Sequence, residues 1–86
     1  MSYEIDRTPK AKRLLKKLPA DVQKDVEDSL EEIAENPRRD GAIKLTDVHP
    51  PTHRYKAGAD YRIIYRIDDS AQVVRVLEVR NRKDAY

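Results

Sequence analysis

The spacing of apolar residues changes along the chain, and its first part is typical of a short strand followed by a helix. Tyr3 and Ile5 alternate with acidic residues, which predicts a strand with one buried face over residues 2–7. Thr8 followed by Pro9 is a helix start signal, because a threonine hydroxyl caps the first turn and proline fits the first helical position. The helix then presents one apolar stripe, made of Ala11, Leu14, Leu15 and Leu18.

A second amphipathic helix is predicted directly after the first. Pro19 closes the first helix, and the second ends before Pro37, which disfavours helical geometry at the residue preceding it. Its apolar positions are Val22, Val26, Leu30 and Ile33. Two amphipathic helices with so short a connection are expected to fold back on each other as an antiparallel hairpin held by their apolar stripes.

The rest of the chain is typical of strands, because its apolar residues recur every second position. A short strand is expected over residues 42–46, and after a loop with a Pro-Pro pair the alternation resumes at His53. Residues 61–67 alternate bulky apolar side chains with arginines. Residues 72–79 are nearly all apolar or β-branched, which predicts a strand covered on both faces, and residues 80–86 are expected to form a polar tail.

These elements predict an α+β fold in the order β-α-α-β-β-β. The helical hairpin packs on one face of a small, antiparallel-rich sheet, as a single domain over residues 1–86. A chain of this size buries only about 60–65% of its unfolded surface, so the core is thin. No stretch resembles a signal peptide or approaches the length of a membrane span, so we expect a cytoplasmic protein without a membrane partner.

Charged residues make up 40% of the chain, and they are segregated although the net charge is only +2. Residues 8–18 carry five basic side chains and no acid, and residues 20–36 carry seven acids against Lys24 alone. Residues 53–66 carry four basic side chains against Asp60. A near-neutral total can therefore hide a basic face of the kind that meets nucleic acid, although charge also serves solubility alone.

The opposite charges of the two helices are expected to favour their pairing. Exposed ion pairs contribute only about 0–1 kcal/mol each, so the apolar stripes hold the hairpin and the charges select its partner. Alternatively, the basic side chains of the first helix form a surface that contacts RNA or DNA instead of pairing with the acidic helix.

Few residues can carry metal or cofactor chemistry. His49 and His53 lack the carboxylate spacing of a metal site, and we interpret this histidine pair as incidental. Gly41 and Gly58 are the only glycines, so there is no phosphate-binding glycine loop, and no serine or threonine lies in a nucleophile motif. With no cysteine either, we expect no metal and no cofactor.

The remaining arginines, lysines and tyrosines suit the cleavage of RNA by its own 2′-hydroxyl. This reaction needs alignment of the attacking oxygen, neutralisation of charge at phosphorus and a proton for the departing 5′-oxygen. Guanidinium and ammonium groups can meet the first two needs. A tyrosine such as Tyr86, with an ordinary pKa of about 10, is an available acid at neutral pH.

In the order of its elements, in the segment HRYKAGADYRIIYRIDD and in the ending VLEVRNRKDAY, the chain resembles the RelE branch of the RelE/ParE superfamily of bacterial toxins. The resemblance covers essentially the whole chain. It implies the toxin of a type II toxin-antitoxin system, an endoribonuclease or mRNA interferase that cuts messages in the ribosomal A site. The implied partners are a cognate antitoxin, the ribosome and mRNA, with operator DNA bound only through the antitoxin complex.

The resemblance also implies roles for five residues. Arg62 matches the family's arginine that contacts the scissile phosphate, and Arg82 matches a late arginine that stabilises the transition state. Tyr86 matches the tyrosine that stacks on the substrate base and supports catalysis. Arg54 and Lys56 fit the two substrate-binding basic residues of the preceding strand, provided that the turn after them absorbs one residue of slack.

Two features leave alternatives open. Without that slack, His53 and Tyr55 would take the places of the basic pair. Many relatives also carry glycine-histidine before the late arginine, where this chain has Arg80-Asn81, so any contribution of that histidine is absent.

A ParE-like toxin that inhibits DNA gyrase without cutting RNA shares the fold and the tyrosine-arginine strand. The nuclease needs Arg82 and Tyr86, whereas the gyrase inhibitor does not. A third possibility is an inactive relative that only binds an antitoxin.

Overall fold

A mixed five-stranded sheet organises the protein. The structure is a computed structural model that describes residues 2–81. Its elements are β1 (Glu4–Arg7), α1 (Pro9–Lys16), α2 (Ala20–Glu35), β2 (Ile43–Lys44), β3 (His53–Ala57), β4 (Tyr61–Asp68) and β5 (Val73–Asn81). The strand order is β1-β5-β4-β3-β2, with β1 parallel to β5 and all other neighbours antiparallel. The predicted α+β fold with two helices on a small, antiparallel-rich sheet is confirmed, but four strands follow the helices within residues 2–81, whereas the order β-α-α-β-β-β has three.

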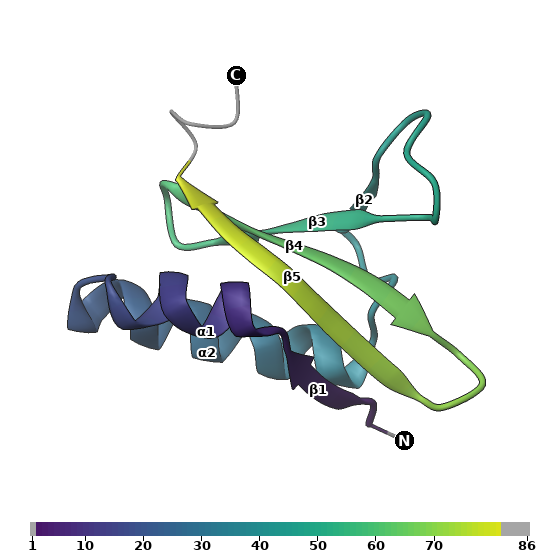
Figure 1. Ribbon diagram of the computed structural model, residues 1–86, viewed down its shortest axis with the longest axis horizontal. Helices are drawn as coiled ribbons and strands as arrows, with labels where there is room; N and C mark the ends of the chain where they lie inside the picture. The colour runs from purple at the N-terminus through teal and green to yellow at the C-terminus, as the bar shows by residue number, and fades with distance from the viewer. Residues whose placement is uncertain (1, 82–86) are drawn as a thin grey trace.

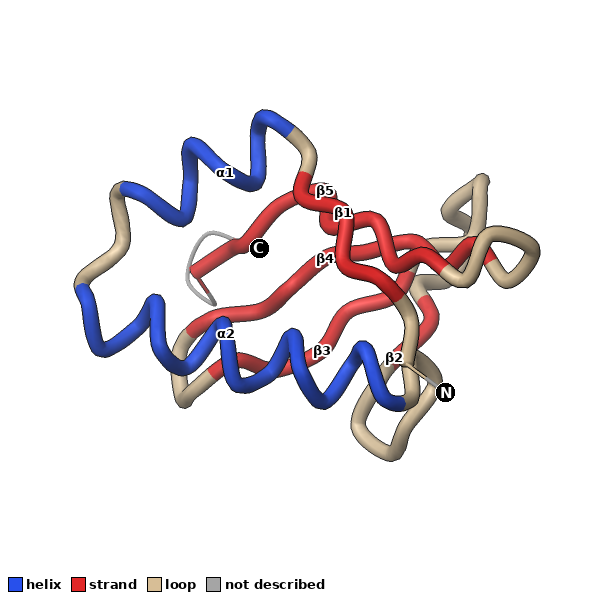
Figure 2. The backbone as a smooth tube through the Cα atoms, turned by 90° about the horizontal axis from the view of Figure 1, so that it is seen from below, coloured by secondary structure: helices blue, strands red, loops and turns tan. Residues whose placement is uncertain are grey.

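The two helices form one layer against the sheet (Figures 1 and 2). Helix α1 packs mainly on β5, and α2 packs mainly on β3. The core lies between the layers and is built from Val26, Leu30 and Ile33 of α2, Ile63 and Tyr65 of β4, and Val74 and Val76 of β5. Because both helices lie on the same side, no helix within residues 2–81 covers the other face of the sheet, and in this sense we call it the helix-free face (Figure 2). No helix within residues 2–81 is long and apolar enough to cross a membrane.

The predicted charge pairing of the two helices is wrong. Among residues 2–81, no ion pair joins α1 to α2. The acidic helix is instead paired with Arg7 of β1, 2.6 Å from Glu27, and with Arg39 of the following connector, 3.5 Å from Glu32. The physical reason is that the buried residues of α1, Ala11 and Leu15, belong to the core shared with the sheet. Burial of these apolar side chains outweighs the small gain from exposed ion pairs.

Strand β5 is longer and less covered than its composition predicts. It continues through Arg80 and Asn81, which were expected in a polar tail, and Arg75 within it is exposed rather than covered. A bulge divides its pairing with β4, because Ile64 lies opposite Glu78 whereas Tyr65 lies opposite Val76. The extra residue is Leu77 of β5, so Val76 and Val79 both face the core although they are three positions apart.

Candidate nucleic-acid interface

The helix-free face of the sheet carries cations from three neighbouring strands. Lys56 of β3 lies directly opposite Arg62 of β4, and Arg62 lies directly opposite Arg80 of β5. Residues paired in this way project to the same face of a sheet, as do residues two apart along a strand, so Arg54 joins the group. We call Arg54, Lys56, Arg62 and Arg80 the cationic cluster.

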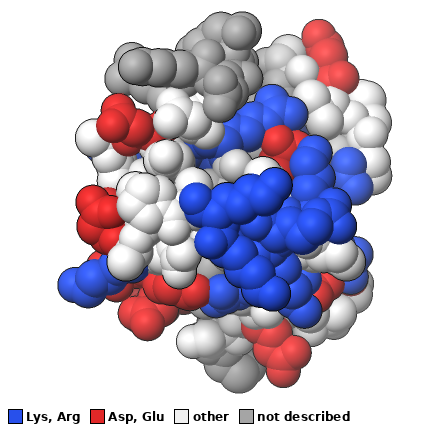
Figure 3. All heavy atoms as spheres, turned by 60° about the vertical axis from the view of Figure 1, so that its left-hand side comes forward, with Lys and Arg blue, Asp and Glu red and all other residues white. Residues whose placement is uncertain are grey.

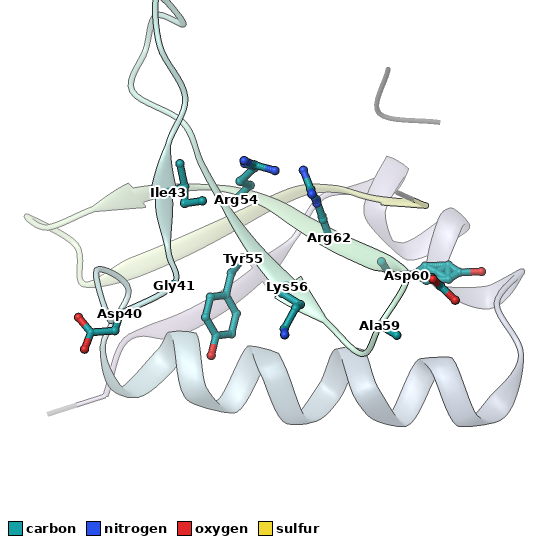
Figure 4. Close-up of a pocket in the computed structure, with 10 residues that line it drawn as sticks. Asp40, Gly41, Ile43, Arg54, Tyr55, Lys56, Ala59, Asp60 and Arg62 are labelled. Carbon is teal, nitrogen blue, oxygen red and sulfur yellow. The ribbon is translucent and has the colours of Figure 1, made fainter. Parts of the chain in front are cut away.

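The cationic cluster lines two pockets. Arg54 and Arg62 border both of them, and Figure 4 shows these two side chains pointing away from α2, whereas Tyr55 points toward it. The first pocket has a volume of about 430 Å³ and the second about 310 Å³. Lys56 and Tyr61 belong to the first and Arg80 to the second, so each pocket combines guanidinium groups with other cationic or aromatic side chains.

The register of β3 places the basic pair on the face of Arg62. His53 and Tyr55 lie on the opposite side of the strand: the His53 ring stacks on the buried Tyr65 ring at 5.7 Å, and the Tyr55 hydroxyl donates to Glu32 of α2 at 3.3 Å. Across the turn of residues 58–60, Ala57 pairs with Tyr61 and Lys56 with Arg62. The structure brings together three of the five predicted site residues, Arg54, Lys56 and Arg62.

Arg80 is a member of the cluster that the sequence analysis missed. Its guanidinium bonds to the carboxylate of Glu78, which also accepts from the Lys10 ammonium at 3.4 Å. The Arg80 hydrogen bond, together with nearby positive charge, lowers the pKa of Glu78. The available signal was alternation: Val79 is buried, so the next residue of a continuing strand points outward.

The two remaining predicted site residues, Arg82 and Tyr86, lie outside the described residues. Their placement stays a prediction from the sequence.

The cluster brings like charges close together, and Glu78 offsets part of this repulsion at Arg80. Like charges directly opposite each other in a sheet are destabilising, by roughly 0.2–1 kcal/mol per pair, and the Lys56–Arg62 and Arg62–Arg80 pairs are both of this kind. Guanidinium groups bind phosphate oxygens bidentately and keep their charge at any physiological pH. The arrangement can therefore hold a phosphate and neutralise charge that develops on it.

Solved structures of bacterial toxins share this fold. A chain of the RelBE2 toxin-antitoxin complex of Mycobacterium tuberculosis is 30% identical with a TM-score of 0.83, covering 95% of this chain and 100% of that chain. The E. coli toxin RelE, as a double arginine-to-alanine mutant in the free state, is 29% identical with a TM-score of 0.81, covering 99% and 87%. The intact E. coli RelBE toxin-antitoxin complex gives 27% identity and a TM-score of 0.81, covering 93% and 96%. No curated protein sequence matches significantly.

The fold is thus shared with toxins that were solved alone and in toxin-antitoxin complexes. A family model described as the ParE toxin of the type II toxin-antitoxin system parDE matches residues 5–86. The chain belongs to this toxin family, within the RelE/ParE superfamily.

Proposed function

We propose that the protein is a ribosome-dependent endoribonuclease that cleaves mRNA in the ribosomal A site. The observation that carries the proposal is the cationic cluster, in which Arg54, Lys56, Arg62 and Arg80 face one side of the sheet around two pockets. Such a cluster suits a phosphate that gains negative charge during a reaction. Similarity to RelE toxins over nearly the whole chain gives independent support.

In the proposed reaction the 2′-hydroxyl gives up its proton to water as its oxygen attacks phosphorus. The bond to the 5′-oxygen breaks, which leaves a 2′,3′-cyclic phosphate and a 5′-hydroxyl. Arg54 and Lys56 hold the RNA, and Arg62 and Arg82 neutralise the charge on the phosphorane. Tyr86 stacks on a base and protonates the departing oxygen. Arginine and tyrosine are weak acid-base catalysts near neutral pH, so the ribosome is expected to supply the alignment of the substrate.

The proposed regulator is a cognate antitoxin. The M. tuberculosis and E. coli relatives were solved as toxin-antitoxin complexes. An acidic or amphipathic antitoxin segment that wraps this domain would cover the cationic cluster. Any contact with operator DNA would be made through that complex, and we place the protein in the cytoplasm without a membrane partner.

A second candidate is inhibition of DNA gyrase without RNA cleavage, and the match to the ParE model favours it. The two activities need different residues. The nuclease depends on Arg82 and Tyr86, whereas the gyrase inhibitor does not.

The deciding experiment adds the purified protein to a translating extract and, in parallel, to gyrase with relaxed plasmid. We expect primer extension to reveal breaks within translated codons, no cutting of the same RNA without ribosomes, and normal supercoiling. Intact messages together with trapped gyrase-DNA complexes would instead establish the second candidate. If neither target responds, the chain is an inactive relative.

Matched variants test the roles of the arginines. Arg62→Ala and Arg82→Ala should each reduce cleavage about 100-fold or more, because each removes a group that stabilises transition-state charge. Lys24→Ala, an exposed cation on the acidic helix, is the control and should cleave normally. Full cleavage by a correctly folded Arg82→Ala protein would refute its assigned role.

A further inference from the structure

Helix α1 and its C-terminal cap carry an unusual concentration of positive charge. The five cations are exposed, and residues 8–18 contain no acid; they are Lys10, Lys12, Arg13, Lys16 and Lys17. Figure 3 shows Lys and Arg side chains gathered in one patch on the side of the molecule where α1 lies. The helix dipole accounts for cations in the last turn, but it opposes Lys10 near the N-terminus. Helix stability alone therefore does not explain the patch.

Among residues 2–81, four of these cations have no carboxylate partner. Lys10 lies 3.4 Å from Glu78, but Lys12, Arg13, Lys16 and Lys17 form no ion pair within residues 2–81. Their charge is thus available to an external anion.

The cations fall on two flanks of the helix. Lys10, Arg13 and Lys17 are three and four positions apart and form one row, which we call the α1 ridge. Thr8 bonds to the carbonyl of Val76 and Lys10 to Glu78, so the ridge follows β5 in the direction of Arg80.

Lys12 and Lys16 occupy the other flank. They line a groove beside Gln23 and Glu27 of α2.

We propose that the α1 ridge binds the phosphate backbone of structured RNA outside the cleavage site. We expect this RNA to be ribosomal RNA, and this expectation rests on the proposed function. The ridge is about 10 Å long, and helical nucleic acid presents a phosphate about every 3.4 Å of axis per strand, so it can contact more than one phosphate. Glu78 contacts both Lys10 and Arg80, so the ridge continues from the cationic cluster.

The surface favours nucleic acid over an acidic protein segment. A helical peptide that docks in a groove relies on apolar anchors. The only large exposed apolar residue among residues 2–81 is Ile43, which belongs to β2 at the opposite edge of the sheet from β1. A polyanion needs no such anchor, because phosphate contacts and counterion release supply its affinity.

The test compares two double variants with the same charge change on the same helix. Arg13→Gln/Lys17→Gln removes two ridge cations, and Lys12→Gln/Lys16→Gln removes two from the other flank. The probe is a fluorescently labelled RNA hairpin, and its binding is measured by fluorescence anisotropy at salt concentrations from roughly 50 to 200 mM. Binding through phosphate contacts weakens strongly over this range. Circular dichroism and thermal unfolding check that both variants fold.

We expect the ridge variant to bind the hairpin about tenfold more weakly and to lower the salt-dependence slope by about 1.8, the value for two lost phosphate contacts. The flank variant should stay within about twofold of the parent protein. Equal losses for the two variants would overturn the ridge as a site. Loss of binding to poly-L-glutamate but not to RNA would overturn it in favour of an acidic protein partner.

Cleavage on programmed ribosomes separates this proposal from the proposed function. The ridge variant should raise KM while leaving kcat unchanged, since it lies outside the reacting groups. If the parent protein does not cut RNA, the proposed function fails, yet the hairpin titration still tests the ridge. If the parent cuts and both double variants behave alike, the ridge fails and the proposed function stands.

Discussion

Tyr65 places a hydroxyl at the centre of the small core. Its side chain is fully buried, its hydroxyl donates to the carbonyl oxygen of Pro37 at 2.7 Å, and burial raises its pKa to about 12. This hydrogen bond ties the segment after α2 to β4. The phenol is therefore a structural donor rather than an acid for catalysis.

We expect Tyr65→Phe to lower the free energy of unfolding by about 1–3 kcal/mol, because the Pro37 carbonyl loses its partner in a buried site. Urea denaturation measures this. Tyr3→Phe is the matched control, since the Tyr3 hydroxyl bonds to Asp69 at an exposed site, and it should change stability by less than about 0.5 kcal/mol. Similar losses in both variants would contradict the role given to burial.

His53 makes stability depend on pH. Its ring stacks on Tyr65, and its Nδ1 atom is buried with no hydrogen-bond partner among residues 2–81. Burial, with help from Arg38 and Lys44, lowers its pKa. The unfolded chain therefore binds the proton more readily than the folded one. By linkage, stability is complete above the ordinary histidine pKa of about 6.5 and falls as the pH drops below it.

We expect the unfolding midpoint to decrease between about pH 7.5 and about pH 5.5, and His53→Phe to reduce that decrease. Phenylalanine keeps an aromatic ring against Tyr65 but cannot take up a proton. Thermal unfolding at a series of pH values measures the effect. A variant with the same pH slope as the parent would show that other groups cause the dependence.

At the scale of elements, Thr8 joins the start of α1 to the bulged part of β5. Its hydroxyl oxygen accepts from the Ala11 amide at 3.3 Å and donates toward the carbonyls of Val76 and Leu77 at 2.8 and 3.2 Å. One side chain thus caps the helix and positions it on the sheet.

Thr8→Ala should lower the free energy of unfolding by about 1–2 kcal/mol, the upper range for a lost helix cap, because it also removes the bond to β5. Thr8→Ser retains the hydroxyl and should recover most of the loss. Chemical denaturation of the two variants measures the difference. Equal instability of both would place the effect in the lost methyl group instead.

Local signals predicted the helices well. The second helix was expected to end before Pro37 and ends at Glu35, because proline restricts its immediate neighbour whatever the tertiary contacts. The sequence does not decide whether Arg54 and Lys56 share the face of Arg62, because this depends on the number of residues in the turn between β3 and β4. Arg80 is not predicted, because one polar residue at the end of a strand does not visibly extend the alternation of apolar and polar residues that identifies the strand.

The charge pairing of the helices failed for a different reason. The sequence contains the opposite charges, but only the packing of each apolar stripe decides which element a helix lies against. The spacing of apolar residues therefore predicts which face of a helix is buried, but not which other element covers that face.

For the whole molecule, a net charge of +2 conceals two basic surfaces and one acidic surface. The cationic cluster occupies the helix-free sheet face, the α1 ridge follows β5, and the acids of α2 lie on the helical layer. If an antitoxin silences the protein by covering the cluster, it should leave the acidic helix accessible, because an acidic segment is repelled there.

Lysine acetylation read by mass spectrometry tests this arrangement. Lys56, Lys17 and Lys24 are all exposed and report on the cluster, the ridge and the acidic helix respectively. In the complex with its antitoxin we expect protection of Lys56, while Lys17 and Lys24 stay reactive, because each reporter senses only the surface that carries it. Protection of Lys24 with a reactive Lys56 would mean that the antitoxin acts from the helical side. Protection of Lys17 as well would show that one partner covers both basic surfaces, so that RNA and antitoxin compete for the ridge.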